Sequence, residues 1–162
     1  MSPDNRIQFV DTRGVAFEAE ECGNEHYEAL KQMYDEFYPK GESQGLPPPA
    51  EHDRHQWVER LLQSARNFVI WRGDTVVGHS ALIPDPEEQD GEYIIFVSQP
   101  CRQRGLGTAL TAMAVDRARS MGLVRIWLTV ESYNFRAIKL YRKAGFVFTD
   151  QGERERTMVL IL

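Results

Sequence analysis

Two glycines at positions 105 and 107 mark the clearest candidate for chemistry in this sequence. They lie in the segment V-S-Q-P-C-R-Q-R-G-L-G-T-A-L, where a strand-like run gives way to helix-forming residues. A strand that turns into a helix in this way gathers bare backbone amides at a helix N-terminus, and such a turn binds anions. Glycine keeps side chains away from the anion, although glycines also serve any tight turn. Arg102 and Arg104 add positive charge, and Thr108 adds a hydroxyl.

Two familiar phosphate motifs do not fit this turn. A Walker loop requires Lys followed by Ser or Thr after its last glycine, and no such pair follows Gly107. A dinucleotide fingerprint requires a third glycine, but position 110 is Leu, and no acidic residue ends a following strand at the expected distance. The pyrophosphate of another nucleotide-like cofactor is the ligand that these exclusions favour.

A second motif, E-S-Y-N-F-R-A-I-K-L-Y-R-K-A-G-F, occupies residues 131–146. Together with R-Q-R-G-L-G at residues 102–107, it resembles the signatures of the GNAT superfamily of N-acetyltransferases, R/Q-x-x-G-x-G/A and N-x-x-A-x-x-L-Y-x-x-x-G-F. The resemblance covers essentially the whole chain and is most specific in residues 92–146. The residues that match the second signature are Asn134, Ala137, Leu140, Tyr141, Gly145 and Phe146.

The resemblance implies acetyl-CoA as the cofactor, with its pantetheine arm between two central strands that splay apart. In the family, the residue matching Asn134 contacts the arm near the thiol end, and the tyrosine matching Tyr141 protonates the departing thiolate. Seven residues are about two helical turns, so these two side chains are expected on one face. A core aromatic is the other interpretation of Tyr141. The predicted cofactor-binding residues are Ile95, Phe96, Val97, Arg102, Gln103, Arg104, Gly105, Leu106, Gly107, Thr108, Asn134, Ala137 and Tyr141.

Direct transfer of acetyl to an amine needs a base, because a lysine-like amine has a pKa of about 10.4 and is protonated at neutral pH. Glu92 opens the strand that leads into the glycine turn and is the first candidate, acting directly or through a water. Glu92 resembles a glutamate that begins the equivalent strand in the protein-lysine acetyltransferase branch. The other interpretation of Glu92 is a carboxylate at the end of a strand with no catalytic role. Glu131 and His79 are further candidates. The base of the ribosomal-protein N-terminal acetyltransferase branch is replaced by Thr129.

The surrounding pattern predicts the elements that must position these residues. Apolar residues at helical spacing indicate two early helices with a proline-rich loop between them. The family resemblance implies that these helices and this loop wall the acceptor side of the cleft. The chain is predicted to be one α/β domain over residues 1–162. Its mixed, mostly antiparallel, GNAT-like sheet would have about seven strands and about four helices, with the central two strands parallel and splayed. The predicted helices are 25–38, 51–65, 107–121 and 134–144; the hairpins are 6–20, 67–83 and 146–162; the central strands are 92–97 and 123–130.

Composition narrows the class of protein. The chain of 162 residues is 42% hydrophobic, as in a globular protein, and its net charge of −5 disfavours nucleic-acid binding and favours a cationic acceptor. No apolar run approaches the roughly 20 residues of a membrane span, and no targeting signal is recognisable, so we expect a cytoplasmic location. Cys22 and Cys101 form no redox or zinc motif, and His52 and His55 lack further ligands, so no metal is expected.

The sequence therefore predicts an acetyl-CoA-dependent N-acetyltransferase that acts on a primary amine in a ternary complex. The amine would belong to a small molecule or to a protein lysine or N-terminus, and the chain would be a monomer or a homodimer. An acetylated-cysteine route is disfavoured because Cys101 precedes the phosphate turn. The competing class is a non-catalytic acyl-CoA-binding or sensory module. Tyr141 disfavours that class, because a module that only binds the cofactor needs no acid at the thiol.

Overall fold

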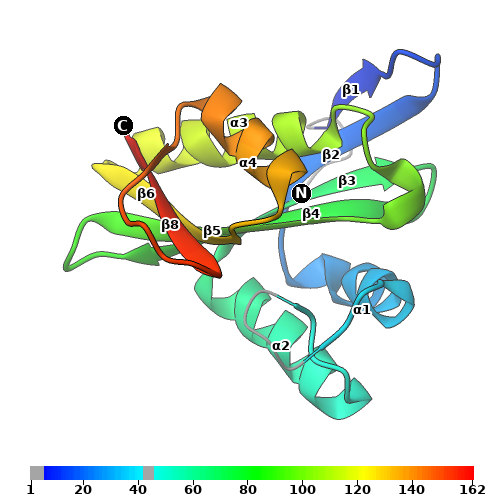
Figure 1. Cartoon of the computed structure of the whole chain (residues 1–162). Helices are drawn as coiled ribbons and strands as arrows, with labels where there is room; N and C mark the ends of the chain where they lie inside the picture. Colours follow the sequence, from blue (N-terminus) through cyan, green and yellow to red (C-terminus); the bar gives the residue numbers. More distant parts are fainter. Residues whose placement is uncertain (1–5, 42–45) are drawn as a thin grey trace.

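The computed structural model of the chain describes residues 6–41 and 46–162. One mixed sheet of eight strands runs through them in the order β1-β2-β3-β4-β5-β6-β8-β7. Every neighbouring pair is antiparallel except β5 with β6, which is parallel. Figure 1 shows α3 and α4 on one face of this sheet and α1 with α2 on the other. The predicted fold class is confirmed, with one strand more than the approximate count.

The elements follow the predicted order closely. The first half of the chain contains β1 (Ile7–Val10), β2 (Ala16–Cys22), α1 (Tyr27–Glu36), α2 (Glu51–Ser64), β3 (Arg66–Arg72) and β4 (Thr75–Asp85). The second half contains β5 (Asp90–Val97), α3 (Leu106–Ser120), β6 (Arg125–Glu131), α4 (Phe135–Ala144), β7 (Val147–Phe148) and β8 (Glu155–Ile161). Helix α1 is shorter than predicted because Phe37 already has an extended backbone. Residues 42–45 of the predicted acceptor loop lie outside the described residues.

Two hydrophobic clusters hold the helices against the sheet. On one face, buried residues of α3 recur every fourth position, at Leu106, Leu110, Ala114 and Ala118, and form the apolar stripe of a surface helix. On the other face, α1 and α2 pack around Tyr34 against β3, β4 and β5. Among the described residues, no helix has the length and apolar character that crossing a bilayer demands.

The parallel strands β5 and β6 separate part of the way along their length. They pair only at Asp90 with Arg125, Gly91 with Ile126 and Glu92 with Trp127, although β5 continues to Val97 and β6 to Glu131. Beyond Glu92, the backbone groups of β5 that face β6 have no strand partner among the described residues. Such groups require hydrogen bonds from water or a ligand. The predicted splay of the central strands is confirmed.

Candidate functional site

The turn between β5 and α3 carries a row of unbonded backbone amides. Gly105 has a φ of 84°, and α3 begins directly after it. Gln103 also has a positive φ, 65°, which is uncommon for a residue with a side chain. The amide of Ala109 bonds back to the carbonyl of Gly105, whereas the amides of residues 103–108 donate to no backbone carbonyl of the described chain. This row lies at the N-terminus of a 15-residue helix, so the turn is suited to an anion.

Gly107 is the point at which β5, α3 and α4 approach one another. A Cβ atom at this position would lie 3.0 Å from Cδ2 of Leu140 and 3.7 Å from Cδ1 of Ile95. The glycine is thus needed for helix packing, which is a different reason from the access for phosphate expected from the sequence. The predicted cofactor residues Ile95 and Gly107 therefore lie close to Leu140, which precedes Tyr141 in α4.

The two arginines of the turn are engaged with other parts of the protein. Arg104 Nη1 lies 2.9 Å from Oδ2 of Asp11, whose side chain is fully buried. Arg102 Nε donates to the carbonyl of Val97 at 3.1 Å, and its guanidinium lies over the ring of Phe37. The charge of Arg104 is therefore neutralised within the protein, and the free amides are the groups best placed to hold an anion.

Arg136 is a cation beside the turn that the sequence analysis did not single out. With its amide oxygen turned toward α4, Gln103 accepts hydrogen bonds from Arg136 Nη2 at 2.9 Å and Nε at 3.2 Å. Arg136 stands in the first turn of α4, where a positive charge opposes the helix dipole. This unfavourable placement is a signal in the sequence for a role toward an anion.

Asn134 was predicted to be the first residue of the helix 134–144. It is instead the N-cap of α4, which begins at Phe135. Its side-chain oxygen accepts the amide hydrogen of Ala137, with a donor–acceptor distance of 3.3 Å. Asn134 is exposed, whereas Tyr141 is buried, and the expectation that both share one helix face stays a prediction. Capping alone explains an asparagine at this position. The contacts of Asn134 and Ala137 with pantetheine stay predictions.

Tyr141 combines a buried ring with a hydroxyl that forms no hydrogen bond with the part of the chain that the structure describes. The ring packs on Phe146 with a centroid distance of 5.8 Å, and 7% of the residue is exposed. Burial, together with the nearby Tyr93, raises the pKa of the Tyr141 hydroxyl. Tyr93 directly follows Glu92, the last residue of β5 that pairs with β6. The hydroxyl of Tyr141 therefore lies near the start of the gap and is protonated at neutral pH, and its role as an acid stays a prediction.

Glu92 stands at the point where β5 and β6 part, on the other face of the sheet from Tyr141. Side chains alternate along a strand, and Tyr93 belongs to the cluster under α3, whereas Ile94 and Phe96 pack toward α1 and α2. Glu92 thus faces the α1–α2 side. It is half-buried, and burial raises the pKa of its carboxyl. A reacting group between the strands would have an acid on one side and a base on the other.

Glu131 and His79, the other base candidates, are placed differently. Glu131 ends β6, and its carboxylate bonds the exposed Tyr133, which raises the pKa of that phenol. It lies in a surface hollow of about 430 Å³ at the start of α4, beyond the paired part of the strands. His79 is fully buried, and burial lowers its pKa to about 3. The histidine is therefore neutral and shielded from substrate.

His79 is the centre of a buried hydrogen-bond network that joins α1 and α2 to the sheet. The Tyr34 hydroxyl lies 2.5 Å from His79 Nδ1, and His79 Nε2 lies 2.8 Å from Oδ1 of Asn67. Asn67 Nδ2 in turn donates to the carbonyls of Leu61 and Ala65 at the end of α2. Tyr34 and Asn67 are buried as well. The network fixes the two helices that cover the face of Glu92.

Protonation of His79 is predicted to weaken the fold below neutral pH. A histidine in the unfolded chain has a pKa of about 6.5, whereas that of folded His79 is about 3, so the unfolded state binds one more proton between these values. The stability from this group is complete above about pH 6.5. It falls by about 1.3 kcal/mol between about pH 7 and about pH 5.5. Urea unfolding at both pH values should show this loss in the protein and in a variant of the exposed His52, His52→Gln. The His79→Gln variant should show a smaller pH dependence, and an equal one would contradict the prediction.

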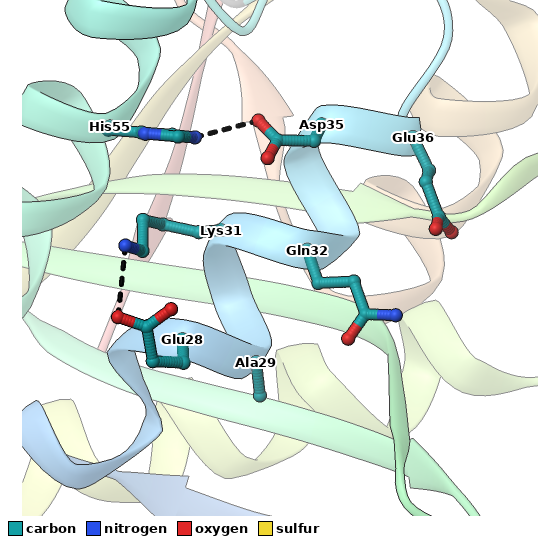
Figure 2. A pocket seen from close by; sticks show the side chains of 7 residues that line it. All are labelled: Glu28, Ala29, Lys31, Gln32, Asp35, Glu36 and His55. Carbon is teal, nitrogen blue, oxygen red and sulfur yellow. Dashed lines mark hydrogen bonds and ion pairs between the residues drawn. The ribbon is translucent and has the colours of Figure 1, made fainter.

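Asp35, Glu51 and His55 form the one group of possible metal ligands found among the described residues, with donor atoms within 4.8 Å of one another. Figure 2 shows His55 of α2 reaching Asp35 of α1 at the edge of a hollow of about 590 Å³. The same oxygen of Asp35 accepts from Arg54 Nη2 at 2.7 Å and lies 2.8 Å from His55 Nε2. Because the guanidinium of Arg54 already supplies a cation to Asp35, the contact of Asp35 with Arg54 and His55 is an ion-pair contact between α1 and α2.

Comparison with known proteins shows which family the chain resembles. Residues 27–146 match the model of the acetyltransferase (GNAT) family. The mycothiol acetyltransferase of Geodermatophilus obscurus is 31% identical over 103 residues, which are 60% of this chain and 33% of that protein. The chain thus spans about a third of the length of this curated relative.

Two solved structures share the fold. The GNAT domain of S. lividans PAT has a TM-score of 0.83 at 15% identity, over 100% of this chain and 99% of that one. The yncA protein of Salmonella typhimurium, solved with its cofactor acetyl-CoA, has a TM-score of 0.69 at 18% identity, over 90% and 94% of the two chains.

Proposed function

The chain belongs to the acetyltransferase (GNAT) family, and from this we propose that it is an acetyl-CoA-dependent N-acetyltransferase that transfers acetyl directly to a primary amine. The family expected from the sequence is confirmed by the match over residues 27–146. The observation that carries the proposal is the gap between β5 and β6, which has free amides at its mouth and Tyr141 and Glu92 near its start. These groups match the donor and acceptor steps of acetyl transfer.

The residues around the gap fit acetyl-CoA. The amides of residues 103–108 can receive its pyrophosphate, with Arg136 close by. The backbone groups of β5 from Tyr93 to Phe96 that have no strand partner can bond the amides of its pantetheine arm, whereas the carbonyl of Val97 already accepts from Arg102. When bound, acetyl-CoA supplies an acetyl group activated as a thioester.

The side chains then divide the proton transfers between the two faces of the sheet. Glu92 takes a proton from the incoming ammonium group, directly or through a water, because only the neutral amine attacks a thioester. Its raised pKa makes the carboxylate a stronger base than an exposed one. Tyr141 gives its proton to the departing sulfur. Helices α1 and α2 cover the face from which the amine enters and limit its exposure to water.

The charges on the helices favour a cationic acceptor. Helix α4 carries basic residues and no acidic one, so the cofactor face is positive. Helices α1 and α2 together carry six acidic and three basic residues, so the opposite face is negative. The basic residues of α4 are Arg136, Lys139, Arg142 and Lys143. A lysine side chain, a polyamine or an amino sugar would be attracted to the face where Glu92 lies.

A panel of amines tests both the activity and the charge argument. With acetyl-CoA present, cationic amines should release the CoA thiol and give a mass increase of one acetyl group, and their kcat/KM should fall as salt rises, because exposed charges are screened. Neutral and anionic amines of similar size are the controls, and a preference for them would contradict the charge argument. Tight acetyl-CoA binding without any acylated product would favour the non-catalytic acyl-CoA-binding module instead.

Other properties stay predictions. They are a cytoplasmic location, a monomeric or homodimeric state, and the absence of metal, nucleic-acid and membrane partners. The length of the acyl chain that the gap accepts is a further property that the same panel measures when longer acyl donors are included.

A further inference from the structure

A buried ion pair connects the turn between β5 and α3 (residues 103–108, called the phosphate turn) to the N-terminal hairpin formed by β1 and β2. Asp11 lies between β1 and β2, and Arg104 follows it by 93 residues. The side chain of Asp11 is fully buried and that of Arg104 is 14% exposed, with 2.9 Å between Arg104 Nη1 and Asp11 Oδ2. A pair this well buried requires good geometry to offset desolvation. The ion pair also neutralises the charge of Arg104, so Arg104 is not available to an anion. The pair is therefore more suited to positioning the turn than to binding a phosphate.

Asp11 is itself held firmly. Its Oδ1 atom accepts hydrogen bonds from the amides of Arg13 and Val15, each at 2.8 Å, and its own amide donates to the carbonyl of Val15 at 2.9 Å. One carboxylate oxygen thus shapes the hairpin turn, and the other receives Arg104. The hairpin provides a fixed point for the guanidinium.

Arg104 occupies the part of the phosphate turn that most needs an anchor. Its neighbours Gln103 and Gly105 both have positive φ values, 65° and 84°. The amides of residues 103–108 make no backbone hydrogen bonds to the described chain that would fix them. The side chain of Arg104 therefore joins a turn with few internal bonds to a rigid part of the sheet.

We propose that Asp11, acting through Arg104, is a positioning residue that holds residues 103–108 in the conformation that binds the cofactor pyrophosphate. The proposal rests on the proposed function, because it concerns the acetyl-CoA site. A turn ordered in advance binds more tightly, since the cost of ordering it is not taken from the binding energy. The β1–β2 hairpin is then part of the cofactor site without touching the cofactor.

A second ion pair between the N-terminal hairpin and α3, more exposed than the first, provides a control. Arg117 Nη2 of α3 pairs with Glu21 Oε2 of β2, so this pair also joins the N-terminal hairpin to the segment that follows the phosphate turn. Arg117 lies 11 residues after the first residue of α3, which is about 16 Å along a helix. Loss of this pair removes a similar connection without releasing the turn.

Isothermal titration of the full-length chain with CoA tests the inference. Asp11→Asn keeps an oxygen for the amides of Arg13 and Val15 and removes the charge. Its Kd for CoA should rise about tenfold, as expected for a loss of preorganisation, while the acceptor KM stays unchanged. Glu21→Gln should keep the Kd of the unchanged protein, and urea unfolding should show a smaller loss of stability for it than for Asp11→Asn, because its ion pair is more exposed.

Three results would overturn the inference. They are an unchanged Kd in Asp11→Asn, a tighter Kd, which would mean that Asp11 only masks a phosphate-binding cation, and an equal rise in Glu21→Gln. If Asp11→Asn does not fold, Arg104→Gln replaces it and should raise the Kd for CoA by a similar factor, and an unchanged Kd in Arg104→Gln would then overturn the inference. Failure of the unchanged protein to bind CoA would instead contradict the proposed function itself.

Discussion

Replacing Tyr141 with Phe should lower kcat by about two orders of magnitude, the usual contribution of a positioned general acid. The hydroxyl of Tyr141 is the group removed, and the ring that packs on Phe146 is kept. A phenol has an ordinary pKa of about 10 and is protonated at neutral pH, and burial raises the pKa of Tyr141 further, so the hydroxyl carries a proton for the leaving sulfur. The Kd for CoA should change by less than about twofold, since the change affects the transition state more than ground-state binding. Steady-state kinetics and titration with CoA measure the two quantities separately.

Tyr93→Phe is the matched control for this variant. Tyr93 is also buried, but its hydroxyl is bonded to Oγ1 of Thr111 at 3.0 Å. Its removal should lower the free energy of unfolding by about 1 kcal/mol, the typical effect of losing one hydrogen bond, with little effect on kcat. The reverse pattern, in which Tyr93→Phe reduces kcat and Tyr141→Phe does not, would identify Tyr141 as a core aromatic only.

Replacing Glu92 with Gln should lower kcat/KM for the amine by about 100-fold at neutral pH and by less at high pH. With Glu92 present, an ammonium group is deprotonated on the enzyme, so the rate is nearly level at pH values above the pKa of Glu92. With Gln, only the amine that is already neutral reacts. Its fraction falls about tenfold for each pH unit below its pKa of about 10.4. The deficit should therefore grow steadily as the pH falls.

Glu131→Gln is the comparison for Glu92→Gln, because Glu131 is the other carboxylate near the strands. It should keep the flat pH profile. A steep profile in Glu131→Gln with a flat one in Glu92→Gln would reassign the base. A uniform loss of acetyl-CoA affinity in Glu92→Gln would show that Glu92 supports the fold of the gap and does not transfer a proton.

Local patterns predicted the elements and the order of the motifs, because each pattern depends on neighbouring residues. The apolar run of β5, the glycine after it and the helical spacing in α3 are examples. The parallel pairing of β5 with β6 also followed, since a strand, helix and strand in sequence form a crossover. The splay came from the family resemblance, because no local feature of Tyr93 or Leu128 encodes where pairing stops.

Contacts between distant parts of the chain could not be predicted in the same way. The Arg104–Asp11 pair and the Tyr34–His79–Asn67 network depend on the order of strands in the sheet, and that order fixes which side chains meet. The sequence suggested that Arg104 contacts the cofactor pyrophosphate and that His79 is a candidate base for the acceptor amine. In both cases the burial of the side chain and its partner, which only the folded chain defines, gives a structural role.

The separation of β5 and β6 leaves backbone groups of β5 without a strand partner among the described residues, and an extended ligand could pair with them much as an added strand does. A strand recognises its neighbour through the spacing of amides along the backbone, and the identity of side chains matters little to that recognition. This stretch would then recognise an extended ligand that carries amides. The side chains of residues 93–97 pack into the two hydrophobic clusters. If the proposed cofactor binds here, its recognition would use the backbone atoms of residues 93–96, and core packing uses their side chains.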